Sequence, residues 1–393
     1  MESNPTSPLH LDCNATTAAS AEVVEAMLPW LGRAGANPSA THGAGREAAR
    51  AVRRARASVA ALVGASAPEI VFTSCGSEST VTAVRSAARA RPGGSVVISA
   101  VEHSATKRAV EAEAGADRTV VVGVDAGGAL DRDAVRRALD GDAALVSLIL
   151  VNNETGVVSD LAGLGDACRA AGARLHIDAV QAPGKVPIDV GELGCDYLSL
   201  SAHKFHGPRG IGALYVREGA PLVPLVVGGP QEDERRAGTE NVPGIVGMGV
   251  AADRAAARAA SAEDQARIAR QRDRLEAAVL AGCPGARVHG DRARRVANTA
   301  NIGFDLADSG LDASALLAIL HDEGIEVSAG SACNSHRTAP SPVLLGMGLD
   351  EAAASSALRF SLAHAGTPDA IDDAGIDRAA ACVISAHRAL MAI

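Results

Sequence analysis

The hydrophobic pattern of this chain alternates between short apolar runs and alanine-rich stretches from about residue 45 to about residue 250. Several of the runs are apolar at successive positions, which is typical of strands whose two faces are both covered by helices. The predicted strands cover residues 69–73, 95–99, 144–150, 174–177, 197–200 and 212–216. Strands that alternate with helices predict an α/β fold with a mostly parallel sheet flanked by helices.

The pattern becomes looser after residue 250 and predicts a second domain. Residues 250–280 contain neither proline nor glycine and are expected to form one long helix between the domains. A strand near 299–304, a helix near 313–323 and a loop rich in glycine and serine at 329–341 follow. Because 393 residues exceed what one core normally supports, we expect a large domain of residues 17–255 and a smaller α+β domain. The smaller domain is expected to combine residues 1–16 and 256–393.

Composition and charge argue against several classes of protein. No apolar run approaches the roughly 18 residues of a membrane span, and the first residues lack the basic and apolar regions of a signal peptide, so we expect a cytoplasmic protein without membrane contact. The net charge of −9, without a block of basic residues, argues against nucleic-acid binding. The seven cysteines stand singly, which argues against disulfides and against a metal site. We interpret six of them as small buried residues.

A lysine stands directly after one of the predicted strands. Lys204 follows the strand at 197–200 and precedes a glycine- and proline-containing turn. Such a lysine can simply end a strand, which is the ordinary interpretation of the position by itself. A lysine that forms a Schiff base with an aldehyde cofactor needs a rigid, enclosed site in which its pKa can be depressed. Ser201 and His203 flank this lysine and are candidate phosphate ligands.

Two further positions could belong to the same kind of site. Asp178 stands at the carboxyl end of the strand at 174–177, where a carboxylate could keep the pyridine nitrogen of pyridoxal phosphate protonated. It could equally cap the following helix. Residues 73–79 place glycine and small hydroxyl side chains between a strand and a helix, a position that suits a phosphate. Ordinary helix capping by Ser74 or Ser77 would explain the same residues.

The order of these features along the chain indicates a particular class of enzyme. A phosphate loop, then Asp178, then Lys204, each at a strand end, matches the fold-type I pyridoxal-phosphate-dependent transferases, and strand ends are where open α/β sheets bind ligands. The sequence resembles the cysteine desulfurases of the nitrogen-fixation and iron–sulfur-cluster type (group I), within the class-V aminotransferase-like superfamily. The resemblance covers roughly residues 9–367. Its blocks lie at residues 11–17, 37–42, 102–104, 152–156, 178–181, 201–204, 236–241, 328–333 and 359–361.

The resemblance implies a cofactor site for pyridoxal 5′-phosphate. Lys204 would hold the cofactor aldehyde, Asp178 would pair with the ring nitrogen and His103 would stack on the ring. Asn153 or Gln181 would hydrogen-bond the ring oxygen. The residues implied for the phosphate are Gly76, Ser77, Ser201, His203 and, from a second subunit, Thr239. That last contact makes the expected active unit a homodimer. Without the resemblance, His103 could be a core histidine at a strand end.

The resemblance also implies a substrate site and a nucleophile. Arg359, with Asn153, would bind the substrate carboxylate, because a guanidinium donates two parallel hydrogen bonds to it. By itself, Arg359 could be half of a surface ion pair. Cys333 lies in a loop of small polar residues, as expected of an exposed sulfur carrier that is partly thiolate. The other interpretation of Cys333 is a structural cysteine.

The implied activity is that of a pyridoxal-phosphate-dependent cysteine desulfurase acting on L-cysteine. Lys204 or His103 would move the α-proton as general base. The Cys333 thiolate would attack the substrate sulfur, so that L-alanine leaves and Cys333 carries a persulfide. An acceptor protein would take the sulfur, and the sequence does not name it. Iron–sulfur assembly, thiolation of tRNA or DNA, and synthesis of a sulfur-containing natural product all remain open.

Three departures from the family pattern and three rival functions accompany this interpretation. Pro230 interrupts a run that is usually three glycines, Cys75 stands where glycine is usual, and Thr80 replaces a common asparagine. A selenocysteine lyase or a specialised C–S lyase would share the fold and the cofactor. A non-catalytic scaffold or sulfur-relay partner would keep the fold alone, and the intact Lys204 and Asp178 argue against it.

Overall fold

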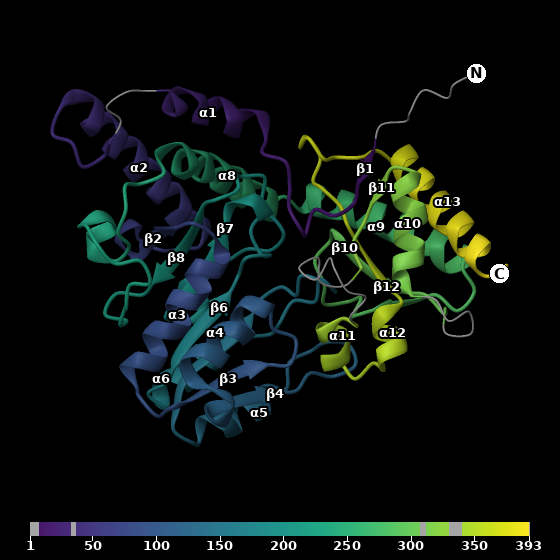
Figure 1. The fold of residues 1–393 in the computed structure, drawn as a ribbon, viewed down its shortest axis with the longest axis horizontal. Coiled ribbons are helices and arrows are strands. Elements are labelled where there is room, and N and C mark those ends of the chain that lie inside the picture. Colours follow the sequence, from purple (N-terminus) through teal and green to yellow (C-terminus); the bar gives the residue numbers. More distant parts are fainter. Residues whose placement is uncertain (1–7, 33–36, 307–311, 330–339, 393) are drawn as a thin grey trace.

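The computed structural model describes residues 8–32, 37–306, 312–329 and 340–392. Two bodies lie side by side, a larger one built on a seven-stranded sheet and a smaller one built on a three-stranded sheet (Figure 1). The strands of the large sheet are β2 (Ile70–Thr73), β3 (Ser95–Ser99), β4 (Thr119–Val122), β5 (Ala143–Ile149), β6 (Arg174–Asp178), β7 (Tyr197–Ser201) and β8 (Gly212–Val216).

The large sheet is mostly parallel, as predicted. Its order is β2-β8-β7-β6-β5-β3-β4, and β8 runs antiparallel to both of its neighbours. The other four pairs are parallel. Two antiparallel steps bring β2 back to the direction of β6 and β7, so these three strands end at one edge. The sequence prediction omitted β4, whose Val120 and Val121 are exposed at the other end of the sheet.

Helices cover both faces of the large sheet. Val71 packs in one core with α3 (Gly76–Ala90) and α4 (Ser104–Ala114), whereas its neighbours Ile70 and Phe72 pack in another with α2 (Gly43–Leu62) and α8 (Val242–Ala260). This alternation is what a strand produces when both faces are buried. The other helices around this sheet are α1 (Ala21–Leu31), α5 (Arg132–Leu139), α6 (Leu164–Ala170) and α7 (Val190–Leu193), with the 3₁₀ turns η1 (Ala67–Glu69), η2 (Ala116–Arg118), η3 (Ala202–Lys204) and η4 (Gln231–Glu234).

The smaller body is α+β, as predicted. Its antiparallel sheet has the order β12-β10-β9, and β1 pairs with β11 in a separate parallel pair. A separate hydrophobic core lies between β10, β12 and three of the helices. The elements are β1 (Leu9–His10), α9 (Ala262–Gly282), β9 (Arg287–His289), β10 (Thr299–Gly303), α10 (Ala313–Asp322), β11 (Ile325–Glu326), α11 (Pro342–Gly346), α12 (Glu351–Ser355), β12 (Ala357–Ser361) and α13 (Asp373–Leu390). The boundaries at residues 16/17 and 255/256 stay a prediction.

The single helix predicted for residues 250–280 is wrong. Two helices, α8 and α9, meet at Ser261, which has the non-helical angles φ −86° and ψ 99°. The Ser261 hydroxyl accepts a hydrogen bond from the Asp264 N–H at 3.2 Å and so begins α9. The cue was a serine followed by acidic residues at 263 and 264, a helix start that contains neither proline nor glycine.

The chain crosses from the smaller body to the larger one between β1 and α1 (Figure 1). We call residues 11–17 the crossing segment. On one side its backbone bonds to β12, where Cys13 N–H donates to the Ser361 carbonyl at 3.1 Å. On the other side Thr17 N–H donates to the His203 carbonyl at 2.9 Å. The segment therefore joins the two bodies directly. No helix in the described ranges is long and apolar enough to cross a bilayer.

Candidate active site

A cavity of about 370 Å³ lies at the edge where β2, β6 and β7 end. Gly212 is the reason these ends come so close. It begins β8 and is paired with Thr73 on one side and Ser201 on the other. A Cβ at Gly212 would lie 2.7 Å from the carbonyl carbon of Cys75 and 2.8 Å from the oxygen of Leu200. Only glycine leaves room for this approach.

The structure brings most of the predicted site residues together around this cavity. Those that line it are Gly76, Ser77, His103, Asn153, Asp178, Gln181, Ser201, His203, Lys204 and Arg359. Thr239 is exposed and does not line it, so its expected contact with a second subunit stays a prediction. Cys333 lies outside the described residues. The lining residues without a predicted site role are Asn14, Ala15, Cys75, Thr80, Ala105, Ile149 and Val180.

Asp178 and His103 form the electrostatic centre of the cavity wall. Asp178 ends β6 and accepts a hydrogen bond from the Val180 N–H at 3.0 Å. Burial raises the pKa of Asp178, and the nearby His103 and Lys204 oppose this shift. Burial lowers the pKa of His103, which Asp178 partly offsets. A buried carboxylate here therefore gains most from a cationic partner in the cavity.

The ring of His103 is held by the start of α4. His103 caps this helix, and its Nδ1 accepts a hydrogen bond from the Ala105 N–H at 3.1 Å. Because burial lowers its pKa, the ring is neutral, and its one proton sits on Nε2. The ring is thus fixed in orientation and in tautomer.

Lys204 is held by the crossing segment. It ends the 3₁₀ turn η3 directly after β7, and its Nζ donates to the carbonyl oxygens of Asn14 and Ala15 at 2.7 and 2.8 Å. Both acceptors are backbone carbonyl groups, and the carboxylate of Asp178 also interacts electrostatically with this lysine. An amine on a strand end, aimed by two carbonyl groups, is the arrangement expected of a lysine that binds an aldehyde.

The predicted phosphate loop lies at the beginning of α3. Gly76 is the first residue of this helix, and a Cβ there would lie 2.7 Å from Cγ2 of Val180. The hydroxyl of Ser201 is buried without a hydrogen-bond partner among the described residues. Burial lowers the pKa of His203 to about 4, so its ring is neutral, and its Nδ1 lies 3.1 Å from Oγ1 of Thr16. Helix N–H groups and a hydroxyl without a described partner are groups that can bind an anion.

Arg359 is a buried guanidinium at the other side of the cavity. It lies on β12 and is 1% exposed, which excludes the surface ion pair that was the ordinary interpretation. Its two terminal nitrogens donate to the Asn153 carbonyl at 3.1 Å and to Oδ1 of Asp12 at 2.5 Å. Its Nε has no partner among the described residues. The group therefore keeps donors for an anionic ligand.

Sequence reasoning missed the contribution of the crossing segment. Asp12 pairs with Arg359, and the carbonyl oxygens of Asn14 and Ala15 accept from Lys204. The block at residues 11–17 was part of the family resemblance, but it carried no role. Every residue has a backbone carbonyl group, so the residue type does not indicate which carbonyl groups act in a site. Only the fold could reveal two of these three contacts.

The two ends of the segment that contains Cys333 lie next to the substrate site. Ser328 exchanges backbone hydrogen bonds with Arg359, at 2.7 and 3.3 Å. Ser341 donates from its hydroxyl to Oε2 of the buried Glu154 at 2.5 Å. Glu154 directly follows Asn153 in the chain. Both anchors of the segment are therefore within the wall that holds Arg359.

The other cysteines mostly match their interpretation as core residues. Cys13, Cys168, Cys195 and Cys283 are buried. Burial raises the pKa of Cys168 and of Cys195 to about 12. Cys75 differs from them, because it is half-buried, caps α3 and lines the cavity. The expectation that six cysteines are buried is thus wrong for Cys75, and Cys382 is half-buried as well.

The departures at Pro230 and Thr80 leave the cavity intact. Glu232 anchors the turn around Pro230. Its carboxylate accepts hydrogen bonds from Arg56 at 2.6 Å and from the Phe72 N–H at 2.9 Å. No residue of 228–232 lines the cavity. Thr80 lines it and bonds to the Ser199 hydroxyl at 3.2 Å.

Glu102 is a buried carboxyl group directly before His103. Its Oε1 accepts from the Ser99 hydroxyl at 2.6 Å and from the Ile149 N–H at 2.9 Å, whereas Oε2 has no partner among the described residues. Burial raises the pKa of Glu102 to about 8. The folded-state pKa thus exceeds the unfolded value of 4.5. The contribution of this pKa shift to the free energy of unfolding is fully present below pH 4.5 and is lost as the pH rises towards 8.

Glu102→Gln is expected to remove this pH dependence. Relative to the variant, the wild-type free energy of unfolding should fall by on the order of 3 kcal/mol between pH 5.5 and pH 8. Urea unfolding of both proteins at the two pH values measures the difference. Glu111→Gln, at an exposed position on α4, is the matched control and should change neither value. Parallel pH profiles for wild type and Glu102→Gln would contradict the raised pKa.

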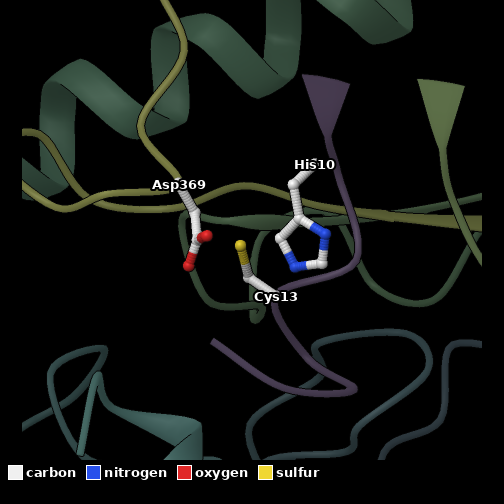
Figure 2. A group of neighbouring side chains, drawn as sticks. All are labelled: His10, Cys13 and Asp369. Atoms are coloured by element: carbon white, nitrogen blue, oxygen red, sulfur yellow. The ribbon is translucent and has the colours of Figure 1, made fainter. Parts of the chain in front are cut away.

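A group of possible metal ligands lies outside the cavity. Figure 2 shows His10, Cys13 and Asp369, whose ligand atoms lie within 4.8 Å of one another. Both ring nitrogens of His10 already face acceptors, Glu326 Oε2 at 2.8 Å and the Thr16 carbonyl at 3.2 Å.

The protonation states of this group argue against a metal. Burial lowers the pKa of His10, but the hydrogen bonds to Glu326 and Thr16 outweigh it, so the net shift is upward. Burial raises the pKa of Cys13. A ring whose two nitrogens already have hydrogen-bond partners and a thiol whose pKa is raised are poor metal ligands, and we assign no metal to the group.

Comparison with known proteins finds similarity to cysteine desulfurases and NifS-like proteins. A cysteine desulfurase of Cereibacter sphaeroides is 46% identical over 368 residues, which cover 93% of each chain. The structure of a NifS-like protein superposes with a TM-score of 0.85 at 30% identity, covering 98% of this chain and 100% of the other. A structure titled SspA in complex with cysteine has a TM-score of 0.78 at 31% identity, covering 93% and 100%.

These similarities extend over both bodies and confirm the predicted fold class. The sequence model of the family Aminotransferase class-V matches residues 9–373. That range contains the crossing segment, the cavity and the strand that carries Arg359. The chain therefore belongs to the class-V aminotransferase family.

Proposed function

We propose that this protein is a cysteine desulfurase, which takes the sulfur of L-cysteine as a persulfide on Cys333 and releases L-alanine. The observation that carries the proposal is the single cavity that assembles Lys204, Asp178, His103 and Arg359. The curated relative named cysteine desulfurase, which aligns over 93% of both chains, supports the same activity.

The residues of the cavity fit pyridoxal 5′-phosphate. Ser201 Oγ and Asn153 Oδ1 are buried and lack partners among the described residues, so a bound group can satisfy them. The close contact beneath Gly76 leaves no room for a side chain at the start of α3. Lys204 would hold the aldehyde, Asp178 the ring nitrogen, and Ser77, Ser201 and His203 the phosphate. When bound, the cofactor supplies an electron sink for the α-carbon of the substrate.

The geometry favours Lys204 over His103 as the general base. The lone pair on Nδ1 of His103 is occupied by the Ala105 N–H, and Nε2 carries the ring proton in the neutral form. The ring therefore has no nitrogen free to accept the α-proton. The Lys204 amine, held by two neutral carbonyl groups, can accept this proton once it is deprotonated.

The substrate would be held at its carboxylate and attacked at its sulfur. Arg359 lines the cavity and its Nε has no partner among the described residues, while Asp12 and the Asn153 carbonyl fix the guanidinium. The Cys333 sulfur forms a bond to the substrate sulfur, the bond from that sulfur to the β-carbon breaks, and its electron pair stays with carbon. Ser328 and Ser341, described residues on either side of the Cys333 segment in the sequence, bond to Arg359 and to Glu154 respectively.

The products distinguish this function from its rivals. The purified protein with pyridoxal phosphate, L-cysteine and a thiol reductant is expected to release alanine and sulfide in a one-to-one ratio. Pyruvate and ammonia in place of alanine would indicate a C–S lyase that works by β-elimination. Turnover of selenocysteine without turnover of cysteine would indicate a selenocysteine lyase. An inactive protein that binds no cofactor would support a scaffold.

Cys75 provides a probe of cofactor binding. Its sulfur accepts from the Glu78 N–H at 3.5 Å, at the mouth of the predicted phosphate site. Iodoacetamide is expected to label Cys75 several-fold more slowly in the presence of pyridoxal phosphate, because the cofactor covers it. Mass spectrometry of the Cys75 peptide measures the rates. Cys382, half-buried on α13, is the internal control and should be unaffected. Equal rates at Cys75 with and without cofactor would contradict the proposed phosphate position.

A homodimer is the proposed active unit. The described surface exposes large apolar side chains that a second subunit could cover, namely Val24, Leu28 and Leu31 on α1, and Val226 and Val227. Thr239 is exposed, as its proposed contact with the partner's phosphate requires. Sedimentation at assay concentrations is expected to show a dimer, and a fully active monomer would exclude composite sites. A separate protein is proposed to accept the sulfur.

A further inference from the structure

Lys185 is a buried amine that the mechanism above does not use. It is 8% exposed, and its Nζ donates to Oε1 of Gln181 at 2.7 Å and to Oδ1 of Asn14 at 2.8 Å. Both acceptors are neutral amides, and no ion pair joins Lys185 to a carboxylate in the described ranges. An unpaired buried cation is costly, and burial lowers the pKa of Lys185 to about 7. A lysine that is costly to bury is expected to have a structural or functional role.

The contacts of Lys185 determine which way the Gln181 amide points. Gln181 Nε2 donates to the Asn14 carbonyl oxygen at 2.8 Å, while Oε1 accepts from Lys185. The reversed amide would place two donors against each other at Lys185 and two acceptors at Asn14. Because a carbonyl oxygen has only lone pairs and an ammonium group only N–H groups, the Asn14 carbonyl and protonated Lys185 favour this one orientation. A neutral Lys185 also keeps N–H groups that can donate in this way.

The two ends of this amide bond to different groups. The Asn14 carbonyl that binds Nε2 also accepts from Lys204 Nζ at 2.7 Å, and both Asn14 and Lys204 line the active-site cavity. Lys185 does not line that cavity. It lines a second, smaller pocket, together with His364, Arg258 and Lys204. The N–H end of Gln181 therefore shares its acceptor with Lys204, while the carbonyl end bonds to Lys185, which is not part of the active-site lining.

We propose that Lys185 is a positioning residue for cofactor binding, which holds Gln181 so that its amide presents N–H, and not C=O, to the ring oxygen of pyridoxal phosphate. The inference rests on the proposed function, because Gln181 acts here on that cofactor. The ring oxygen is an acceptor that carries negative charge, so an N–H group attracts it and a carbonyl oxygen repels it. Without Lys185 the amide can turn over.

A double-mutant cycle tests this coupling by cofactor affinity. Cofactor-free wild type, Lys185→Met, Gln181→Leu and the double variant are titrated with pyridoxal phosphate in equilibrium dialysis. Each single variant is expected to bind about tenfold more weakly. The double variant should lose no more than Gln181→Leu alone, because Lys185 acts through Gln181. Lys107→Met is the matched control, since this half-buried lysine bonds to the Ala100 carbonyl at 2.8 Å and does not line the cavity.

Two outcomes would overturn the proposal. Wild-type affinity in Lys185→Met is one, and about a hundredfold loss in the double variant, the product of two independent effects, is the other. The thermal midpoint of each cofactor-free variant shows whether it is folded. If Lys185→Met is unfolded, Lys185→Gln takes its place in the same cycle. The criterion is unchanged: the substitution at Lys185 should weaken binding no further when Gln181→Leu is already present. Failure of wild type to bind the cofactor would instead contradict the proposed function.

Discussion

Lys204→Ala is expected to abolish desulfuration, with turnover falling at least about a thousandfold. The variant loses both the covalent attachment of the cofactor and the amine that moves the α-proton. These two losses fall on one atom, Nζ, which the carbonyl oxygens of Asn14 and Ala15 hold in the cavity. Removing Nζ therefore blocks the whole desulfuration reaction and does not merely raise the energy barrier of one step.

Alanine release and visible absorbance together measure this effect. The wild-type protein with pyridoxal phosphate should show an absorption band in the visible range that Lys204→Ala lacks. Lys107→Ala should keep both the band and the activity, because Lys107 lies outside the cavity lining. Normal turnover in Lys204→Ala would show that another residue holds the cofactor.

Cys333→Ser is expected to reduce sulfide release from L-cysteine to near background while leaving cofactor binding unchanged. A serine hydroxyl is a far weaker nucleophile than a thiolate at neutral pH. The cavity residues Lys204, Asp178 and Arg359 are untouched by this change. The visible band and its response to added cysteine should therefore persist, which separates loss of the nucleophile from loss of the site.

Mass spectrometry after incubation with cysteine and no reductant locates the sulfur. An added sulfur atom on the Cys333 peptide is the expected result. Cys75→Ser is the matched control, because Cys75 is the described cysteine that lines the cavity. This control should retain the adduct and the activity. An adduct on Cys75 alone, or full activity in Cys333→Ser, would assign the chemistry to another thiol or to an elimination.

The sequence predicted the strands of the large sheet well because their signal is local. Residues such as Ile70, Val71 and Phe72 are apolar in succession, and each is buried on one face or the other. The break between α8 and α9 was missed because Ser261 ends one helix and begins the next, with neither glycine nor proline to mark it. A side-chain cap is a weaker signal than a residue that cannot be helical.

The candidate site was predicted where side-chain chemistry identifies it and missed where the backbone or a distant partner supplies it. Lys204, Asp178 and Arg359 follow from residue type and resemblance. The acceptors of Lys204 are carbonyl groups, which every residue carries. The contact between Asp12 and Arg359 joins residues 347 positions apart, a distance that no local pattern spans.

The crossing segment also has a consequence for how the protein is made. Its residues leave the ribosome before those of the large sheet, yet the Asn14 N–H binds the Ser361 hydroxyl at 2.9 Å, and Asp12 binds Arg359 on the much later strand β12. These contacts cannot form until β12 has been synthesised, more than 340 residues later. The strands of the large sheet can pair before then, since domains generally fold as units during synthesis. The nascent chain can therefore complete the large sheet early, whereas Asp12 and Asn14 gain their partners on β12 only later.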